Sequence, residues 1–354
     1  MMSKIVAGGC KSYDEGLLGP FLTRAFAETG TAPAGCRVLL KPNLLYGKPP
    51  AKAVNTHPLV VRTVALALLE AGCTVFVGDS PGYESTEKAL EKSGIMEVVR
   101  DLGLQVAPFR KRVTKTNDGI SPYRELTFGE DPLDYDLIVN MPKLKTHMMM
   151  GLTAGVKNLF GFVPSLYKAK WHLRCGTDKR LFASLLIDIH AAVRPALTVL
   201  DGITAMDGDG PSGGRVRSLG IVAASDDALA LDAFLEKGLS VPSALPISVV
   251  AAEHGLLRDA EVIDLGMPAV RDFLMPASME VDWNLPPLVR ETARRVFTRK
   301  PKCAAKKCTL CGTCVNVCPA GAIQREETRI SFDYRACIRC FCCQEMCPAN
   351  AITA

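Results

Sequence analysis

The stretch Cys308-Thr-Leu-Cys311-Gly-Thr-Cys314-Val-Asn-Val-Cys318-Pro319 recurs 29 positions later as Cys337-Ile-Arg-Cys340-Phe-Cys-Cys343-Gln-Glu-Met-Cys347-Pro348. Three thiolates at two-residue gaps on a tight loop can hold three corners of one iron–sulfur cubane. The fourth thiolate follows a longer gap, and the proline after it turns the chain away, so it ligates the other cluster. The repeat therefore predicts two [4Fe–4S] clusters with interlocked ligands.

The spacing assigns each cysteine of the repeat to one cluster. The first cluster is expected to be held by Cys308, Cys311, Cys314 and Cys347. The second is expected to be held by Cys337, Cys340, Cys343 and Cys318. Because each copy supplies the last ligand of its partner's cluster, we expect cluster loading to be coupled to folding of this segment. The alternative is a pair of zinc sites, which need neither the third cysteine nor the Cys-Pro step.

The other cysteines are distributed differently. Of the 14 cysteines, ten lie between Cys303 and Cys347, and the other four are far apart in the first three hundred residues. So many thiols in a chain without a visible secretory signal indicate redox or metal chemistry rather than a disulfide framework. Cys303 and Cys342 do not fit the repeat; we interpret them as a linker residue and a packed thiol, with a role as substitute ligands as the alternative.

Length and composition favour a larger protein than a ferredoxin. The 354 residues are 48% apolar, enough for a sizeable core, and the net charge is +5. That charge is too small to indicate a nucleic-acid partner or a membrane surface. No stretch approaches the ~18 uninterrupted apolar residues of a membrane span. We therefore expect a cytoplasmic protein without a membrane span.

Residues 1–290 alternate between strand-like and helix-like segments. Strands are predicted at 4–7, 36–40, 74–77, 104–107, 137–140, 197–200, 219–223 and 247–252. Helices are predicted at 14–29, 57–71, 85–93 and 227–235. This order predicts a three-layer α/β domain with a mostly parallel sheet. It is followed by a basic linker at 291–302 and a small α+β ferredoxin-like domain with two clusters at 303–354.

Polar residues recur where predicted strands end, which is where parallel sheets gather their sites. The candidates for holding a ligand are Lys41, Asn43, Lys143, Lys145, Lys157 and Asn158. The candidates for proton transfer are His147 and Asp79. A cavity lined in this way would suit a carboxylate or a phosphate. The alternative is a set of surface turns with solvated lysines.

Two resemblances accompany these patterns. Residues 301–354 resemble the bacterial two-cluster ferredoxin domain. The motifs Lys41-Pro-Asn-Leu, Thr56-His-Pro, Gly78-Asp-Ser-Pro, Met141-Pro-Lys-Leu-Lys-Thr-His, Gly155-Val-Lys-Asn-Leu-Phe-Gly and Asp201-Gly-Ile-Thr-Ala-Met resemble the DUF362 family over about residues 4–260. Members of that family often carry a ferredoxin domain. The resemblance implies this architecture but no settled reaction.

Two hypotheses for function follow. The first is an iron–sulfur oxidoreductase that passes electrons between a ferredoxin- or flavodoxin-type carrier and an anionic substrate, or an additional organic redox cofactor, in the α/β domain. The second is a non-catalytic carrier or accessory protein whose α/β domain binds a partner or a metabolite. The basic run at 294–307 would steer an acidic carrier, unless it is simply a solvated hinge. Gly208-Asp-Gly-Pro-Ser-Gly213 matches a dinucleotide fingerprint only in its letters, because Pro211 interrupts it.

Overall fold

Alternating burial along the strands places a sheet between two apolar cores. In β2 (Arg37–Pro42), Leu39 joins one core, whereas Val38 and Leu40 join the other. Successive side chains of a strand point to opposite faces of its sheet. Because both faces of β2 are apolar, the sheet has to be covered by helices on both sides.

The computed structural model describes residues 2–276 and 299–353. Within these ranges the main sheet has ten strands, with the order β12-β1-β11-β10-β7-β2-β3-β4 and with β8 and β9 attached beside β10. The strands are β1 (Ser3–Gly9), β2, β3 (Thr74–Val77), β4 (Gln105–Val106), β7 (Leu137–Met141), β8 (Lys143–His147), β9 (Gly151–Thr153), β10 (Leu197–Asp207), β11 (Arg215–Ser225) and β12 (Ala260–Leu265). Along the main path only β11 runs antiparallel to its neighbours, β1 and β10.

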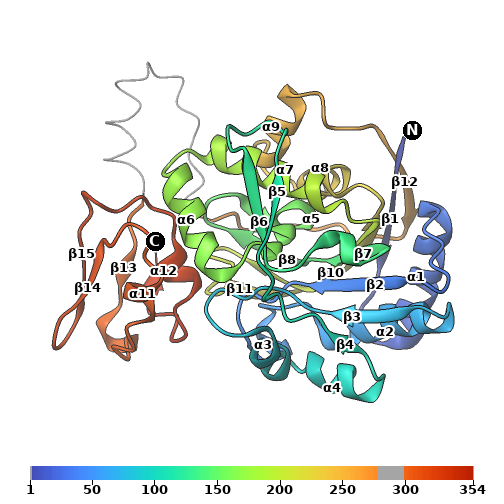
Figure 1. Cartoon of the computed structure of the whole chain (residues 1–354), viewed down its shortest axis with the longest axis horizontal. Coiled ribbons are helices and arrows are strands. Elements are labelled where there is room, and N and C mark those ends of the chain that lie inside the picture. Colours follow the sequence, from blue (N-terminus) through green and yellow to red (C-terminus); the bar gives the residue numbers. More distant parts are fainter. Residues whose placement is uncertain (1, 277–298, 354) are drawn as a thin grey trace.

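Helices cover both faces of this sheet (Figure 1). One face is covered by α1 (Glu15–Thr29), α2 (Pro58–Glu70), α3 (Thr86–Ser93) and α4 (Ile95–Asp101). The other is covered by α5 (Gly155–Asn158), η3 (Leu159–Phe162), α6 (Ser165–Cys175), α7 (Lys179–Val193), α8 (Ala228–Gly238) and α9 (Pro246–Glu253). The predicted three-layer α/β domain with a mostly parallel sheet is confirmed.

Short-range signals set the helix ends. Asp14 accepts a hydrogen bond from the Gly16 N–H at the start of α1, and Gly30 ends that helix with a positive φ of 67°. His57 accepts from the Leu59 N–H at the start of α2. These caps satisfy backbone groups that a helix leaves unpaired at its ends.

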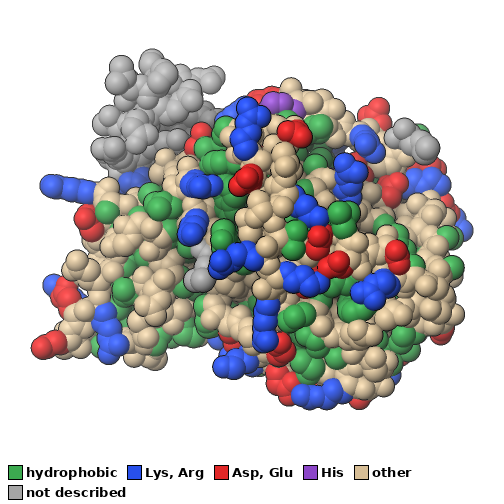
Figure 2. Space-filling view, viewed as in Figure 1, with side chains coloured by type: hydrophobic (Ala, Val, Ile, Leu, Met, Phe, Trp, Pro, Cys, Tyr) green, Lys and Arg blue, Asp and Glu red, His purple; other side chains and the backbone are tan. Residues whose placement is uncertain are grey.

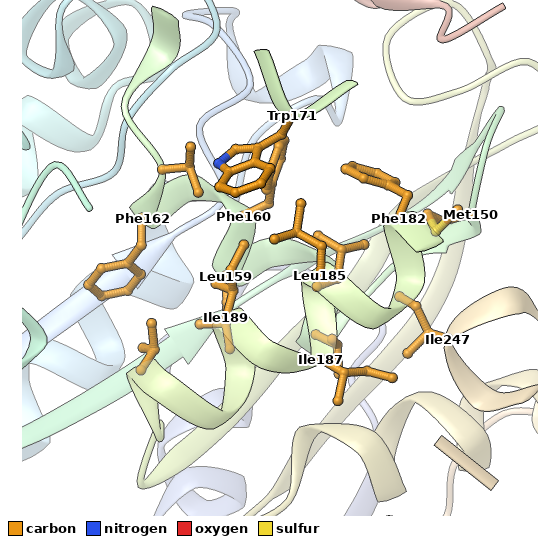
Figure 3. Packing of buried hydrophobic residues seen from close by; sticks show 14 of the residues in the cluster. Met150, Leu159, Phe160, Phe162, Trp171, Phe182, Leu185, Ile187, Ile189 and Ile247 are labelled. Atoms are coloured by element: carbon orange, nitrogen blue, oxygen red, sulfur yellow. The ribbon is translucent and has the colours of Figure 1, made fainter. Parts of the chain in front are cut away.

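Aromatic side chains fill the core between the sheet and the second helical layer. Phe160 and Phe182 meet edge to face, with ring centroids 5.3 Å apart. Figure 3 shows these two rings near Trp171 and Leu185, which come from α6 and α7. The same apolar cluster includes residues 340–342 of the C-terminal domain, so this core continues across the junction between the domains.

One predicted strand is wrong. Residues 247–252 form most of α9 rather than a strand. The run is apolar throughout, and periodicity alone cannot distinguish a short buried helix from a buried strand. Pro246 stands at the first turn, where a helix tolerates proline. The buried residues Ile247, Ser248, Val250 and Ala251 follow helical spacing.

The C-terminal domain, at the left of Figure 1, is built from two small antiparallel pairs. These are β13 (Lys302–Cys303) with β16 (Ile352–Thr353), and β14 (Ile323–Arg325) with β15 (Ile330–Phe332). One short helix starts within each cysteine loop: α11 (Thr313–Asn316) and α12 (Cys342–Glu345). Residues 291–298 of the expected linker lie outside the described residues, and the domain boundaries stay predictions. Among the helices of 2–276 and 299–353, none combines the length and apolarity that crossing a membrane requires.

Candidate functional site

The first cysteine loop (308–318) borders a partly open cavity. Its lining includes Cys308, Cys311 and Cys314 together with Cys347 from the second cysteine loop (337–347). Four sulfur donors around one cavity suit a cubane cluster, which takes one thiolate at each iron. The residues at this site therefore fit the first predicted cluster.

The second set of thiols is more deeply buried. Burial raises the pKa of Cys343 well above its usual value, and Cys340, Cys337 and Cys318 raise it further. Crowded thiolates in a low-dielectric site repel one another, and bound iron would remove that cost because a metal favours the deprotonated sulfur. The grouping is compatible with the second predicted cluster; both ligand assignments stay predictions.

The two additional thiols occupy different surroundings. Cys303 lies in β13, not in a linker, and lines the same cavity as Cys308. Burial raises the pKa of Cys303 to about 11, and the neighbouring Cys308 adds to this effect. Cys342 is buried in the core shared with the α/β domain, which suits a packed thiol.

The predicted site residues at the ends of the strands are brought together. Lys41 Nζ lies 2.8 Å from Asp79 Oδ1, and both side chains are almost completely buried. Asp79 also accepts hydrogen bonds from the backbone N–H groups of Leu44 (2.8 Å) and Ser80 (2.9 Å). This ion pair joins the ends of β2 and β3.

Three asparagines extend the network across the sheet. Asn43 donates to Asn158 Oδ1 (2.9 Å), and Asn158 donates to Asn140 Oδ1 (2.8 Å). Lys145 donates to Asn43 Oδ1 (2.8 Å) and to the Val54 carbonyl (2.5 Å). Burial lowers the pKa of Lys145 to about 7. The ends of β2, β7, β8 and α5 are thus held by side-chain amides.

Lys143 has its own buried partners. It lies 2.9 Å from Asp201 Oδ2 and donates to the Tyr13 hydroxyl at 2.7 Å. Tyr13 in turn donates to Asp201 Oδ1 at 2.9 Å. The alternative of solvated surface lysines is wrong for Lys41, Lys143 and Lys145. Residues 143–147, expected to follow a strand, themselves form β8.

His147 links the sheet to the second cysteine loop. Its Nε2 lies 2.9 Å from Glu345 Oε1, in ion-pair range although the angle is not that of a hydrogen bond. Its Nδ1 accepts from the N–H groups of Met149 and Met150, each at 3.2 Å. The ring proton therefore sits on Nε2 and faces the carboxylate. Glu345 stands two residues after Cys343.

Three buried basic side chains with few polar partners surround this contact: Lys157, Lys168 and His172. Burial lowers the pKa of Lys157, whose Nζ lies 4.8 Å from the Phe160 ring centroid. No hydrogen bond or ion pair joins Lys157 to another described residue. Burial lowers the pKa of Lys168 to about 7, and its Nζ donates to the Ser80 carbonyl. His172 Nδ1 is buried without a hydrogen-bond partner in the described chain.

Charge balance at the junction centres on Glu345. Burial on its own raises the pKa of this carboxyl, but His147, Lys157 and His172 outweigh that effect and bring the pKa to about 2. Lys157 and Lys168 keep partial exposure, unlike the fully buried Lys41. Lys41 is already paired with Asp79, whereas Lys157 has no hydrogen bond or ion pair within the described chain, so Lys157 is better placed than Lys41 to receive an anion.

Sequence reasoning missed Glu345, Lys168 and His172. Glu345 had one signal: an acid inside a cysteine loop, where the first copy has Asn316. Lys168 and His172 lie on α6, which no predicted element covered.

The glycine-rich turn joins two strands, β10 and β11, and does not lead into a helix as a dinucleotide-binding turn would. It contacts the second cysteine loop. Ser212 Oγ donates to the Glu345 carbonyl at 3.0 Å. Gln344 Nε2 donates to the Asp209 carbonyl at 3.2 Å. These bonds fix the second loop on the α/β domain.

We expect His172→Phe to flatten the acid side of the stability profile. Burial lowers the pKa of His172 to about 3. As the pH falls below the ordinary histidine value, the unfolded chain gains a proton that the folded chain does not, so the wild type loses stability. At about pH 5 this loss amounts to about 2 kcal/mol. Thermal unfolding at pH 7 and pH 5 checks it: a variant as acid-sensitive as the wild type would contradict the assignment.

An α/β sheet joined to clustered cysteine loops defines an iron–sulfur protein of the electron-transfer class. The chain belongs to the DUF362 family (domain of unknown function), whose profile matches residues 38–235, and a 4Fe-4S dicluster domain matches residues 300–348. It is 35% identical over 272 residues to the thylakoid-associated protein sll1697 of Synechocystis sp., covering 75% of this chain and 84% of that protein.

Among solved structures, the chain is similar to the lactate racemase apoprotein from Thermoanaerobacterium thermosaccharolyticum. The TM-score is 0.40 and the sequence identity 13%, over 64% of this chain. The match spans 55% of that protein.

Proposed function

We propose that this protein is an oxidoreductase that moves electrons between an external carrier and a small anionic compound bound beside Lys157 and Lys168. The observation that carries this proposal is the unequal placement of the two cysteine loops. The second loop is packed into the α/β core beside the ammonium group of Lys157, which no hydrogen bond or ion pair joins to another described residue. The first loop reaches the surface, where Cys311 is exposed.

The proposed electron path runs from an outer cluster, at the exposed first cysteine loop, to an inner cluster at the buried second loop. Two bound [4Fe–4S] clusters would supply one-electron reduction and oxidation. Cys308, Cys311, Cys314 and Cys347 would hold the outer one. Cys337, Cys340, Cys343 and Cys318 would hold the inner one. In the second loop Cys340 and Cys343 are only 7% and 6% exposed, so a carrier in solution has access mainly to the first loop.

The inner end offers groups for an anion and for a proton. Lys157 and Lys168 can donate charge-assisted hydrogen bonds to a carboxylate or phosphate, which strengthen in a low-dielectric site. That anion belongs to a substrate or to an organic redox cofactor. His147 Nε2–H is placed to exchange a proton. Asp79, already held by Lys41 and two backbone donors, suits anchoring better than proton transfer.

The second candidate is a non-catalytic carrier or accessory protein. One observation favours it. The predicted ligand-binding residues already have partners within the protein, as seen for Lys41, Lys143 and Lys145. In that case the polar network would only hold the sheet ends in place for the second cysteine loop.

Native mass spectrometry of the anaerobically purified full chain separates the two candidates. We expect mass beyond polypeptide, iron and sulfide, or faster reoxidation of the reduced protein by carboxylate- or phosphate-bearing oxidants. Lys157→Gln should lose this property and keep its iron. Lys170→Gln is the matched control, because Lys170 is exposed and its Nζ also lies 4.8 Å from an aromatic ring, that of Tyr167. If the protein holds only iron and sulfide, and carboxylate- or phosphate-bearing oxidants do not speed its reoxidation, the non-catalytic candidate is favoured.

We propose that the carrier is an acidic ferredoxin- or flavodoxin-type protein that docks at the first cysteine loop. Lys306 and Lys307 are exposed in η4 (Ala305–Lys307), directly before Cys308. On the face in Figure 2, Lys and Arg side chains also lie along the boundary between the two domains. The abundance of free cysteines among the described residues supports a reducing, cytoplasmic location for this exchange.

Reversing these two charges should slow carrier association. We expect Lys306→Glu/Lys307→Glu to lower the association rate about tenfold at low salt, and less at high salt, because steering by rim charges is screened. Stopped-flow mixing with a reduced acidic ferredoxin measures it. Lys237→Glu, an exposed lysine on α8, is the control. Equal rates for both variants at low salt would place docking elsewhere.

A further inference from the structure

Two thiols outside the cluster motifs lie side by side in the α/β domain. The Sγ atoms of Cys36 and Cys73 are 3.5 Å apart. Each cysteine directly precedes a strand, Cys36 before β2 and Cys73 before β3. The two strands are parallel neighbours in which Arg37 pairs with Thr74, so the cysteines stand opposite each other at the entry to the ladder.

Backbone hydrogen bonds already hold the segments of the two thiols together. The Thr74 N–H donates to the Cys36 carbonyl at 2.9 Å, and the Gly35 N–H donates to the Ala71 carbonyl at 3.0 Å. Neighbouring strands lie about 4.8 Å apart, within the Cα separation of about 4.4–6.8 Å that a disulfide spans. Closing the sulfurs to bonding distance therefore needs side-chain rotation and little backbone movement.

The two sulfurs differ in access. Cys36 is half-buried, whereas Cys73 is 5% exposed. A small reagent can therefore reach Cys36 first, with Cys73 directly behind it. Burial raises the pKa of the Cys36 thiol, and its hydrogen bond with Cys73 adds to this. The thiolate is then the minor form at neutral pH, so reaction should accelerate as the pH rises.

We propose that Cys36 and Cys73 form a reversible dithiol–disulfide site that exchanges with low-molecular-weight disulfides of the glutathione type. The Cys36 thiolate attacks one sulfur of glutathione disulfide, and one glutathione thiolate leaves. The Cys73 thiolate then attacks Cys36 Sγ, and the second glutathione thiolate leaves. The protein dithiol has lost two electrons, the reagent disulfide has gained them, and the two thiol protons pass to the departing glutathiones.

The consequence is local to the two strands that carry Lys41 and Asp79. A disulfide between Cys36 and Cys73 would link β2 to β3 covalently, at the end of the strands opposite the Lys41–Asp79 ion pair. It would close a segment that contains α2, because the cysteines are 37 positions apart. Cross-linking a segment of this length stabilises a folded domain mainly by restricting its unfolded state. The oxidised protein should therefore unfold at a higher temperature.

The test equilibrates the iron-loaded full chain with glutathione buffers without oxygen, followed by acid quenching, alkylation and peptide mapping. We expect one linked peptide joining Cys36 to Cys73, lighter by two hydrogen atoms, at unchanged iron content. We also expect a raised Tm and faster formation at higher pH. Cys36→Ser should lose the linked peptide and the Tm shift together. Cys10→Ser should keep both, because Cys10 Sγ donates to the Ser12 carbonyl and to no thiol of the described residues.

Three outcomes would overturn the proposal. Both cysteines could be alkylated fully at every buffer ratio. A mixed disulfide of Cys36 with glutathione could accumulate without resolution by Cys73. A Tm shift that persists in Cys36→Ser would show that the stabilisation arises elsewhere. Since Cys36 is half-buried, its serine variant should fold, and iron content together with circular dichroism would verify this.

Discussion

Cys347→Ala should remove the iron bound at the first cysteine loop, although Cys347 belongs to the second. Cys347 borders the same cavity as Cys308, Cys311 and Cys314. Removing one of four thiolates opens a cubane to solvent and oxidants. We expect iron per chain to fall from about eight to about four or fewer, with the remaining cluster weakened because folding and loading are coupled. Iron and sulfide assays of anaerobic protein, with redox titration of the brown absorbance, measure this.

The neighbouring thiol provides the control. Cys342→Ala should keep its iron, since Cys342 contacts the α/β core and lies outside the repeat spacing. Cys311→Ala should behave like Cys347→Ala, because both residues line one cavity. Full iron and a full titration in either of these two variants would refute the interlocked assignment. Zinc in place of iron in anaerobic wild-type protein would refute the cubane interpretation as a whole.

The cysteine loops and most of the sheet could be predicted because their signals are local. Ligand spacing is a property of one loop, and the predicted strand at 74–77 coincides with β3. The helix at 247–252 was predicted as a strand because a short apolar run fits both conformations. The helical conformation of this run depends on its packing against α7 and α8, which cannot be read from the sequence.

The sequence could indicate the candidate residues at the strand ends, but not whether they are buried or paired. Motif position identified Lys41 and Lys143, yet a lysine at a strand end looks the same in a sequence whether it is solvated or buried against an aspartate. The contact of His147 with Glu345 joins two domains far apart in the chain. No periodicity encodes such a contact. It follows from the docking of the second cysteine loop, which depends on the whole three-dimensional surface.

Lys41→Met should cost the α/β domain about 3–5 kcal/mol of unfolding free energy, because it leaves a buried carboxylate without its cation. Lys41 is 0% exposed and Asp79 2%. Two backbone N–H donors, of Leu44 and Ser80, would remain on Asp79. They hydrogen-bond the carboxylate but do not neutralise it. Thermal and urea unfolding followed by circular dichroism give the change.

The residual charge, rather than lost packing, is the expected origin of that loss, and two comparisons isolate it. Lys41→Met/Asp79→Asn should recover part of the stability, because removing both charges ends the desolvation cost. Arg100→Met breaks an ion pair with Glu91 of the same 2.8 Å length, but with side chains 62% and 54% exposed. It should cost less than about 1 kcal/mol, since water and ions screen exposed pairs. A double variant no more stable than Lys41→Met would mean that Lys41 acts through the shape of its buried side chain, and the ion pair would lose its assigned role in joining β2 to β3.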